Sequence, residues 1–153
     1  MKAVLEEFAP RFLTNPAVIL VSESGNEVVS RDDELATSIG LNIPADRYLP
    51  DILLVDLGPA EPLVIFVEVV ATDGPISPTR KEAFLAITRA AKFDDAQVVF
   101  VNAFLDRTQS PFKKAVSDLA WQSFAWFAAE PDHIMFLKEG HTGSTAKLWE
   151  MIG

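Results

Sequence analysis

The chain has 153 residues, about the length of one compact domain, and its 49% apolar and 23% charged residues are typical of a folded protein rather than a disordered one. No window approaches the roughly 18 continuous apolar residues of a membrane span. Glu6 and Glu7 stand where a signal peptide would be basic and then apolar, so we expect a cytoplasmic protein with no membrane partner. With no cysteine and 2 histidines, the composition excludes thiolate metal sites and a zinc centre built from histidines. Any metal ion is expected to be a hard cation held by carboxylates.

The negative charge is concentrated in the first half of the chain. Residues 1–75 hold 4 basic and 13 acidic side chains, whereas residues 76–153 hold 9 of each, and the net charge of the whole chain is −9. Proteins that bind nucleic acid mainly by neutralising phosphates show the opposite sign. If nucleic acid is the partner, another feature of the chain must supply much of the affinity.

Hydrophobic periodicity and turn residues predict the elements of the fold in chain order. Pro10 is expected to end the first helix, Asp32 or Asp33 to begin the second with Gly40 just past its end, and Ser77 to cap the third. The predicted elements are a helix (2–8), a strand (17–21) closed by turn residues (22–26), a helix (33–39), two strands (52–55 and 63–71) that a short turn makes antiparallel, a helix (78–92), a strand (97–104), a helix (110–121), a hairpin or irregular segment (123–136) and a last helical turn (145–151). This order predicts one α/β domain over residues 1–153, with a mixed central β-sheet flanked by helices.

Glu68 is the most informative residue of the sequence, because it interrupts an apolar strand at 63–71. An unpaired carboxylate inside a sheet costs several kcal/mol, so Glu68 needs a partner. One interpretation is a structural glutamate bonded to the backbone or to an arginine. The other involves Asp51, which opens the preceding strand and lies beside Glu68 if the two strands pair around the turn at Gly58.

Two adjacent carboxylates repel each other, so they either share a proton or hold a cation. We expect a divalent ion at neutral pH. Mg²⁺ is commonly held by one or two protein carboxylates together with waters and substrate phosphate oxygens, and this arrangement suits phosphodiester hydrolysis.

Four blocks of the sequence occur in a recognisable order: residues 49–52, 67–80, 100–107, and Trp126 with 130–133. Together they resemble the C-terminal catalytic domain of the BsuBI/PstI type II restriction endonucleases, which belong to the PD-(D/E)xK nuclease superfamily. Residues 9–12 also fit the start of that domain, so the resemblance spans most of the chain. It implies a restriction-endonuclease-like core that cuts duplex DNA with Mg²⁺ bound by Asp51 and Glu68.

The sequence departs from the superfamily pattern at the basic residue. The pattern places a lysine two residues after the glutamate, where this chain has Val70, and the family places a basic pair after the Gly-Pro, where this chain has Thr79 before Arg80 and Lys81. Arg80 shares a helical stripe with 84, 87 and 91 that should face the sheet, whereas Lys81 lies about 100° around the helix. We therefore expect Arg80 to act at the catalytic site and retain Lys81 as the alternative.

Other residues are weaker candidates. Thr72 shares a strand face with Glu68, and Arg107 follows the third apolar strand, so either is a candidate for a DNA phosphate contact; a surface salt bridge is the other interpretation of Arg107. Asp56 is expected to be a turn residue. A glutamate of the first helix, Glu6 or Glu7, could supply a third metal ligand, as in some members of the superfamily.

Two functions follow from these observations. The first is a Mg²⁺-dependent DNA endonuclease, in which a homodimer is implied by analogy. The resemblance leaves three alternatives open for the whole protein: a further N-terminal specificity region, a separate specificity subunit, or a domain that stands alone. The second is a catalytically degenerate nuclease fold that serves as a DNA-binding or assembly module, because the usual lysine is replaced by Val70.

Overall fold

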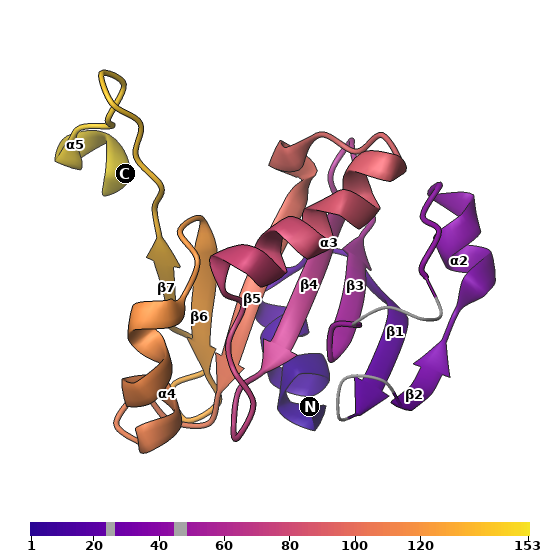
Figure 1. Ribbon diagram of the computed structural model, residues 1–153, viewed down its shortest axis with the longest axis horizontal. Helices are drawn as coiled ribbons and strands as arrows, with labels where there is room; N and C mark the ends of the chain where they lie inside the picture. The colour runs from indigo at the N-terminus through magenta and orange to yellow at the C-terminus, as the bar shows by residue number, and fades with distance from the viewer. Residues whose placement is uncertain (24–26, 45–48) are drawn as a thin grey trace.

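A computed structural model describes residues 1–23, 27–44 and 49–153. The sheet has seven strands in the order β2-β1-β3-β4-β5-β6-β7 (Figure 1). The described elements are η1 (Val4–Phe8), α1 (Ala9–Phe12), β1 (Pro16–Glu23), β2 (Glu27–Arg31), α2 (Asp33–Ser38), β3 (Ile52–Asp56), β4 (Leu63–Val69), α3 (Pro78–Ala90), η2 (Asp95–Gln97), β5 (Val98–Phe104), α4 (Ser110–Ala115), η3 (Val116–Asp118), β6 (Ser123–Phe127), β7 (Ile134–Leu137) and α5 (Leu148–Met151).

The sheet is mixed, as the sequence predicts. The pairs β1 with β2, β1 with β3, β3 with β4, and β6 with β7 are antiparallel. The pairs β4 with β5 and β5 with β6 are parallel. Helix α3 forms the crossover connection from β4 to β5. Strand β4 is the middle strand of the seven, and its apolar run over residues 63–67 reflects burial on both faces.

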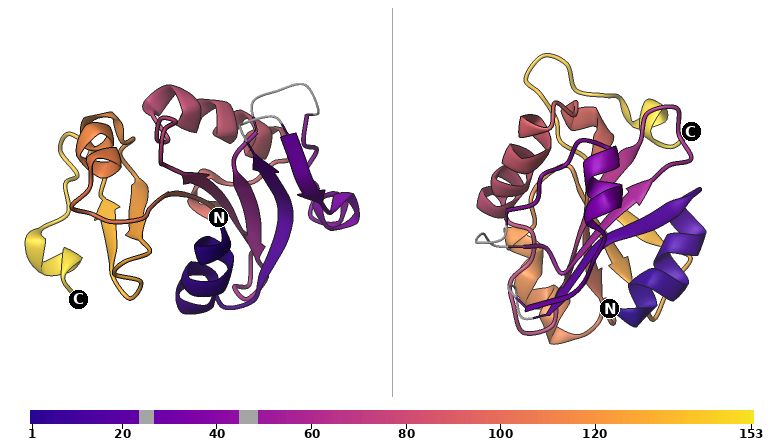
Figure 2. Two further views of the ribbon diagram at one scale, coloured as in Figure 1. Left: turned by 90° about the horizontal axis from the view of Figure 1, so that it is seen from below. Right: turned by 90° about the vertical axis from the view of Figure 1, so that its right-hand side faces the viewer.

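Alternation along β3 and β4 sends side chains to two different cores. Leu53 and Phe66 belong to a cluster that packs under α3, whereas Ile52 and Val67 belong to a cluster with Val4 of the N-terminal helical segment. Figure 2 shows this helical segment and α3 on opposite faces of the sheet. Whether a residue number is odd or even thus determines which face of the sheet a side chain of β3 or β4 occupies.

Helix α3 is positioned by its start and by one aromatic contact. The Ser77 hydroxyl accepts a hydrogen bond from the Arg80 backbone N–H, and Pro78 occupies the first turn, as predicted. Phe84 stacks on Phe66 of β4, with ring centroids 4.7 Å apart and 8° between the ring planes. These contacts hold the first turn of α3 above the end of β4.

Several boundaries differ from the sequence predictions. Pro10 does not end the first helix, because a proline in the first turn of α1 needs no backbone N–H there, and the helical segment runs on to Phe12. Ser22 and Glu23 belong to β1 rather than to a turn, and the remainder of that predicted turn, 24–26, lies outside the described residues. The helix predicted at 110–121 is shorter, since α4 gives way to η3.

The edge strands were the least predictable part of the sheet. Strand β2 was not predicted, because every residue of it is exposed and the segment shows no apolar alternation. Residues 123–136, left open between a hairpin and an irregular segment, contribute the antiparallel pair β6 and β7. Over the described ranges, none of the helices has the length and apolar character needed to cross a bilayer.

Candidate active site

Asp51 and Glu68 come together at one end of the pair of strands β3 and β4. Ile52 pairs with Val67, so the next residue outward on β4, Glu68, lies beside Asp51 at the start of β3. Asp51 has the parity of Leu53, and Glu68 has the parity of Phe66, which places both carboxylates on the α3 face of the sheet. The convergence expected from the sequence is present.

The two carboxylates have different surroundings. Asp51 is half-buried, and its Oδ2 accepts a hydrogen bond of 2.7 Å from the backbone N–H of Val69. Glu68 is only 2% exposed. Its Oε2 lies 3.6 Å from Nη1 of Arg80, while its Oε1 is buried with no hydrogen-bond partner among the described residues. A buried oxygen in this condition is costly in a folded protein unless a proton or a cation satisfies it.

The protonation of Glu68 is set by this environment. Burial raises the pKa of Glu68 to about 9 from an ordinary value of 4.5, and repulsion by the Asp51 carboxylate adds to the increase. The Arg80 guanidinium opposes the shift, while the charge of Asp73 favours it. Glu68 therefore carries a proton at neutral pH unless another cation takes its place.

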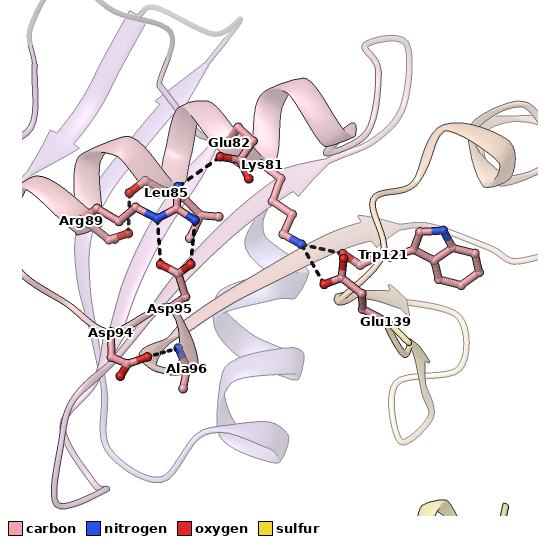
Figure 3. A network of polar contacts seen from close by, with 10 residues as sticks. Lys81, Glu82, Leu85, Arg89, Asp94, Asp95, Ala96, Trp121 and Glu139 are labelled. Carbon is pink, nitrogen blue, oxygen red and sulfur yellow. Dashed lines mark hydrogen bonds and ion pairs between the residues drawn. The ribbon is translucent and has the colours of Figure 1, made fainter. Parts of the chain in front are cut away.

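Arg80 and Lys81 turn out to have different partners, which the helical geometry anticipated. Arg80 approaches Glu68 and donates a hydrogen bond of 3.1 Å to the backbone carbonyl of Gly74. Lys81 instead donates to the backbone carbonyl of Trp121 at 3.0 Å and lies 3.8 Å from a carboxylate oxygen of Glu139 (Figure 3). Of the two basic residues, the structure places Arg80 at the pair of carboxylates.

Asn102 supports the site in a way that the sequence did not reveal. It pairs with Glu68 across β4 and β5 and is fully buried. Its Oδ1 accepts a hydrogen bond of 2.7 Å from the backbone N–H of Ile76, and its Nδ2 donates to the backbone carbonyl of Phe124 at 3.1 Å. Asn102 thereby ties the loop that precedes α3 to the sheet. A polar residue within the apolar strand 97–104 was the available signal.

The remaining candidates lie in less specific places. Thr72 is exposed in the loop after β4. Arg107 forms a two-pronged ion pair with Glu130, with N to O distances of 2.9 and 3.2 Å, which matches the salt-bridge interpretation. Val70, which stands two residues after Glu68, is buried in an apolar cluster with Phe104 and is part of the core.

The acidic residues of the N-terminal helical segment are engaged elsewhere. Glu7 forms an ion pair of 2.6 Å with Arg11, which also contacts Asp132, and Glu6 lies 4.0 Å from Lys2. In the part of the chain that the structure describes, no three metal-ligating side chains of histidine, cysteine or acidic type are grouped. A third protein ligand from Glu6 or Glu7 is therefore not assembled in this structure.

Asp56 has a structural role rather than that of a simple turn residue. Its side chain is on the opposite face from Asp51 by strand parity and is buried. It accepts hydrogen bonds of 2.9, 2.8 and 3.0 Å from the backbone N–H groups of Thr14, Asn15 and Gly58. Asp56 thus fastens the segment before β1 to the end of β3.

The donor set at the α3 face suits a magnesium ion. It offers two carboxylates and a guanidinium beside them, and one carboxylate has a buried oxygen that accepts no hydrogen bond from the residues the structure describes. Mg²⁺ is usually bound by one or two protein carboxylates and completes its octahedral shell with water and substrate phosphate oxygens. A site with two acidic ligands is therefore sufficient for this ion without a third.

Comparisons with known proteins agree with this geometry. A family model described as the BsuBI/PstI restriction endonuclease domain matches residues 1–140. The type II restriction enzyme BsuBI of Bacillus subtilis is 27% identical over 135 residues, which are 88% of this chain and 40% of that enzyme. The structure of SdaI restriction endonuclease matches with a TM-score of 0.76 and 25% sequence identity, covering 96% of this chain and 44% of that one. This chain spans less than half the length of either relative.

Proposed function

The chain belongs to the BsuBI/PstI restriction endonuclease family, and on that premise we propose that it is the catalytic domain of a type II restriction endonuclease that hydrolyses duplex DNA with Mg²⁺. Within this proposal the domain is of the PD-(D/E)xK type and corresponds to the C-terminal part of the larger family members. The restriction-endonuclease-like fold, predicted from the sequence, is confirmed by the match to the SdaI enzyme.

One observation carries the proposal: the buried Oε1 of Glu68 has no hydrogen-bond partner among the described residues, although Asp51 and Arg80 stand beside this carboxyl group. A glutamate retained only for packing would normally have both oxygens satisfied. A cation bound between Asp51 and Glu68 would satisfy the free oxygen and relieve the repulsion between the carboxylates.

Each residue of the site has a role in this proposal. Asp51 and Glu68 hold Mg²⁺, with the Val69 N–H keeping Asp51 oriented through its other oxygen. When bound, the ion polarises a phosphate oxygen and makes water more acidic. Arg80 stabilises negative charge that develops on the phosphate, a task for which a guanidinium is well suited because it binds phosphate oxygens in pairs.

The acidic first half of the chain fits a domain that binds DNA weakly by itself. Residues 1–75 carry 13 acidic and 4 basic side chains, so phosphate neutralisation by this half is weak. We infer that the further length present in both relatives, or a separate specificity subunit, adds DNA contacts, and that two copies pair to cut both strands. We also propose that Thr72 and Arg107 contact DNA phosphates, and Arg107 must first be released from its ion pair with Glu130. The proposed location of the protein is the cytoplasm.

A second function is favoured by one specific observation, the burial of Val70 where the superfamily has its lysine. In that case the fold would serve as a DNA-binding or assembly module without hydrolysis. The two functions differ in whether the chain cleaves DNA. Only the endonuclease needs Asp51 and Glu68 for its activity.

The test is cleavage of DNA in the presence of Mg²⁺. A mixture of long genomic DNA is suitable because it offers many recognition sequences at once. We expect the wild-type chain to cut it and the variants Asp51→Asn and Glu68→Gln to lose cutting, whereas Glu82→Gln, an exposed acid on α3, retains it. Cleavage that persists in both site variants would refute the roles of Asp51 and Glu68. DNA binding without any cleavage in the wild type would exclude the endonuclease in favour of the binding or assembly module.

A further inference from the structure

A cavity of about 570 Å³ opens beside the proposed catalytic arginine. The loop at Gly74 and the first turn of α3, including Arg80, form one side, and the segment from Ser117 to Trp121 forms the other. Its volume is within the range of sites that bind small organic groups. Arg80 lines the cavity and also lies beside Glu68, so the cavity adjoins the Asp51 and Glu68 site at a surface that the proposed hydrolysis does not yet use.

Trp121 is the most unusual residue of this cavity, because its side chain is left in solvent. The residue is 62% exposed, whereas Trp126 in the neighbouring strand is 1% exposed. In Figure 3 the indole of Trp121 points away from Lys81, although the backbone of the same residue is held by it. A large exposed aromatic ring beside a cavity is a common means of contacting a flat ligand.

The backbone around Trp121 is fixed from three directions. The Ala120 N–H donates to the Ile76 carbonyl at 3.0 Å, Lys81 holds the Trp121 carbonyl, and the Gln122 N–H donates to the Leu137 carbonyl at 2.6 Å. Gln122 also adopts a φ of 65°, a left-handed conformation that a residue with a Cβ rarely keeps without such support. Because the backbone is already ordered, binding at the exposed ring loses little conformational entropy.

The charges of the cavity indicate which part of DNA the ring contacts. Arg80 lies on the side of the carboxylates, where a phosphate is expected, and Asp118 lies on the side of Trp121. A carboxylate repels phosphate but accepts hydrogen bonds from the amino groups of bases. The combination of an aromatic face and an acceptor fits a nucleobase better than a phosphate.

We propose that Trp121 stacks on a nucleobase next to the phosphate held at Arg80, and that Lys81 is a positioning residue that keeps Trp121 in place. The inference rests on the proposed endonuclease function and names the part of the substrate that the cavity receives. Bases within a paired duplex are already stacked on their neighbours, so the base that reaches Trp121 is displaced from the stack. Stacking on an aromatic side chain tolerates any base, so this contact strengthens binding without setting the recognition sequence.

The first experiment measures binding of short random-sequence duplexes, each with one unpaired base, to chains carrying Asp51→Asn to prevent cleavage. We expect Trp121→Ala to weaken binding about tenfold or more, and Trp121→Phe to retain most of the affinity. Trp149→Ala is the matched control, because Trp149 is 73% exposed on α5 and does not line the cavity, and its affinity should be unchanged.

Tryptophan fluorescence reports the contact directly. DNA should quench the emission of the chain with Trp121 present, and the quenching should vanish in Trp121→Phe while it persists in Trp149→Phe. Lys81→Met should reduce both quenching and affinity, and Lys81→Arg, which can still donate to the Trp121 carbonyl, should restore them. A purely structural role of Lys81 would lower the melting temperature without this pattern.

The outcomes separate the inference from the proposed function. Suppose that the wild type cleaves DNA and that the chain with Trp121 binds the duplexes. If Trp121→Ala then binds equally well, or if DNA quenches the fluorescence of Trp121→Phe equally, the stacking contact is refuted and the endonuclease function is retained. If the wild type neither binds nor cleaves DNA, both are refuted.

Discussion

Phe84 of α3 lies flat on Phe66 of β4, and this contact places Arg80 over Glu68. Arg80 is four residues before Phe84 on the helix, and Glu68 is two residues after Phe66 on the strand. Four helical residues and two strand residues both advance about 6 Å, so the two charged side chains meet one step beyond the aromatic pair. The observed separation of 3.6 Å between Arg80 Nη1 and Glu68 Oε2 follows from this register.

Replacing Phe84 should therefore harm both the core and the site. Phe84→Ala removes a buried ring that packs on Phe66, and we expect the free energy of unfolding in urea to fall by about 3–5 kcal/mol. Phe136→Ala is the control, because Phe136 also stacks on a phenylalanine but is half exposed on the edge strand β7. Equal losses in the two variants would contradict the central position of Phe84.

The protonation of Glu68 predicts how stability depends on pH. Between an ordinary pKa of 4.5 and the folded-state pKa of about 9, the folded chain keeps a proton on Glu68 that the unfolded chain has lost. Raising the pH across this window therefore favours unfolding. We expect this part of the decline to disappear in Glu68→Gln and to remain in Glu82→Gln, measured by urea unfolding with a metal chelator present. Identical slopes in wild type and Glu68→Gln would show that Glu68 titrates normally.

Arg80 and Lys81 should contribute to cleavage by different routes. Arg80→Ala removes the cation beside Glu68 and should lower the cleavage rate about 10²- to 10³-fold, the usual effect of losing one group that stabilises transition-state charge. Lys81→Arg should cleave at nearly the wild-type rate, because arginine can still hold the Trp121 carbonyl. Arg89→Ala, on the exposed end of α3, serves as the control. A loss in Lys81→Arg as large as in Arg80→Ala would place the catalytic charge on Lys81 instead.

Asp56 should stabilise the fold when its carboxylate is ionised, and this stabilisation should be lost at low pH. Burial raises the pKa of Asp56, but the N–H groups of Thr14, Asn15 and Gly58 outweigh it and hold the pKa below the ordinary value of 3.8. The stabilisation is therefore present above pH 4 and lost as the pH falls through the lowered pKa. At neutral pH Asp56→Ala should lose on the order of 3 kcal/mol, since three donors lose their acceptor. A loss no greater than that of Asp106→Ala, in an exposed loop, would contradict this.

The sequence was sufficient to predict the central strands and the meeting of Asp51 with Glu68, because strand alternation and one short turn determine both. The sequence was also sufficient to favour Arg80 over Lys81 as the residue at the carboxylates. Consecutive residues point in directions about 100° apart around a helix, so only one of the two can face the sheet. These inferences use residues that are near each other in the chain or related by a simple period.

The partners of Lys81 and the role of Asn102 were not predictable in the same way. Trp121 and Glu139 reach Lys81 from 40 and 58 residues further along the chain, through the placement of β6 and β7 at the far side of the sheet. Strand β2 is held by backbone pairing to β1 and has no apolar pattern of its own. Such features depend on tertiary packing, which overrides local sequence preference.

The central claim is that Asp51 and Glu68 together bind a magnesium ion, and calorimetric titration with Mg²⁺ tests it most directly. Run at neutral pH in two buffers of different ionisation enthalpy, the titration also counts protons. We predict saturable binding with release of about one proton, since Glu68 must lose its proton to coordinate the metal, and loss of binding in both Asp51→Asn and Glu68→Gln. Absence of binding in the wild type, or binding that survives both substitutions, would contradict the claim.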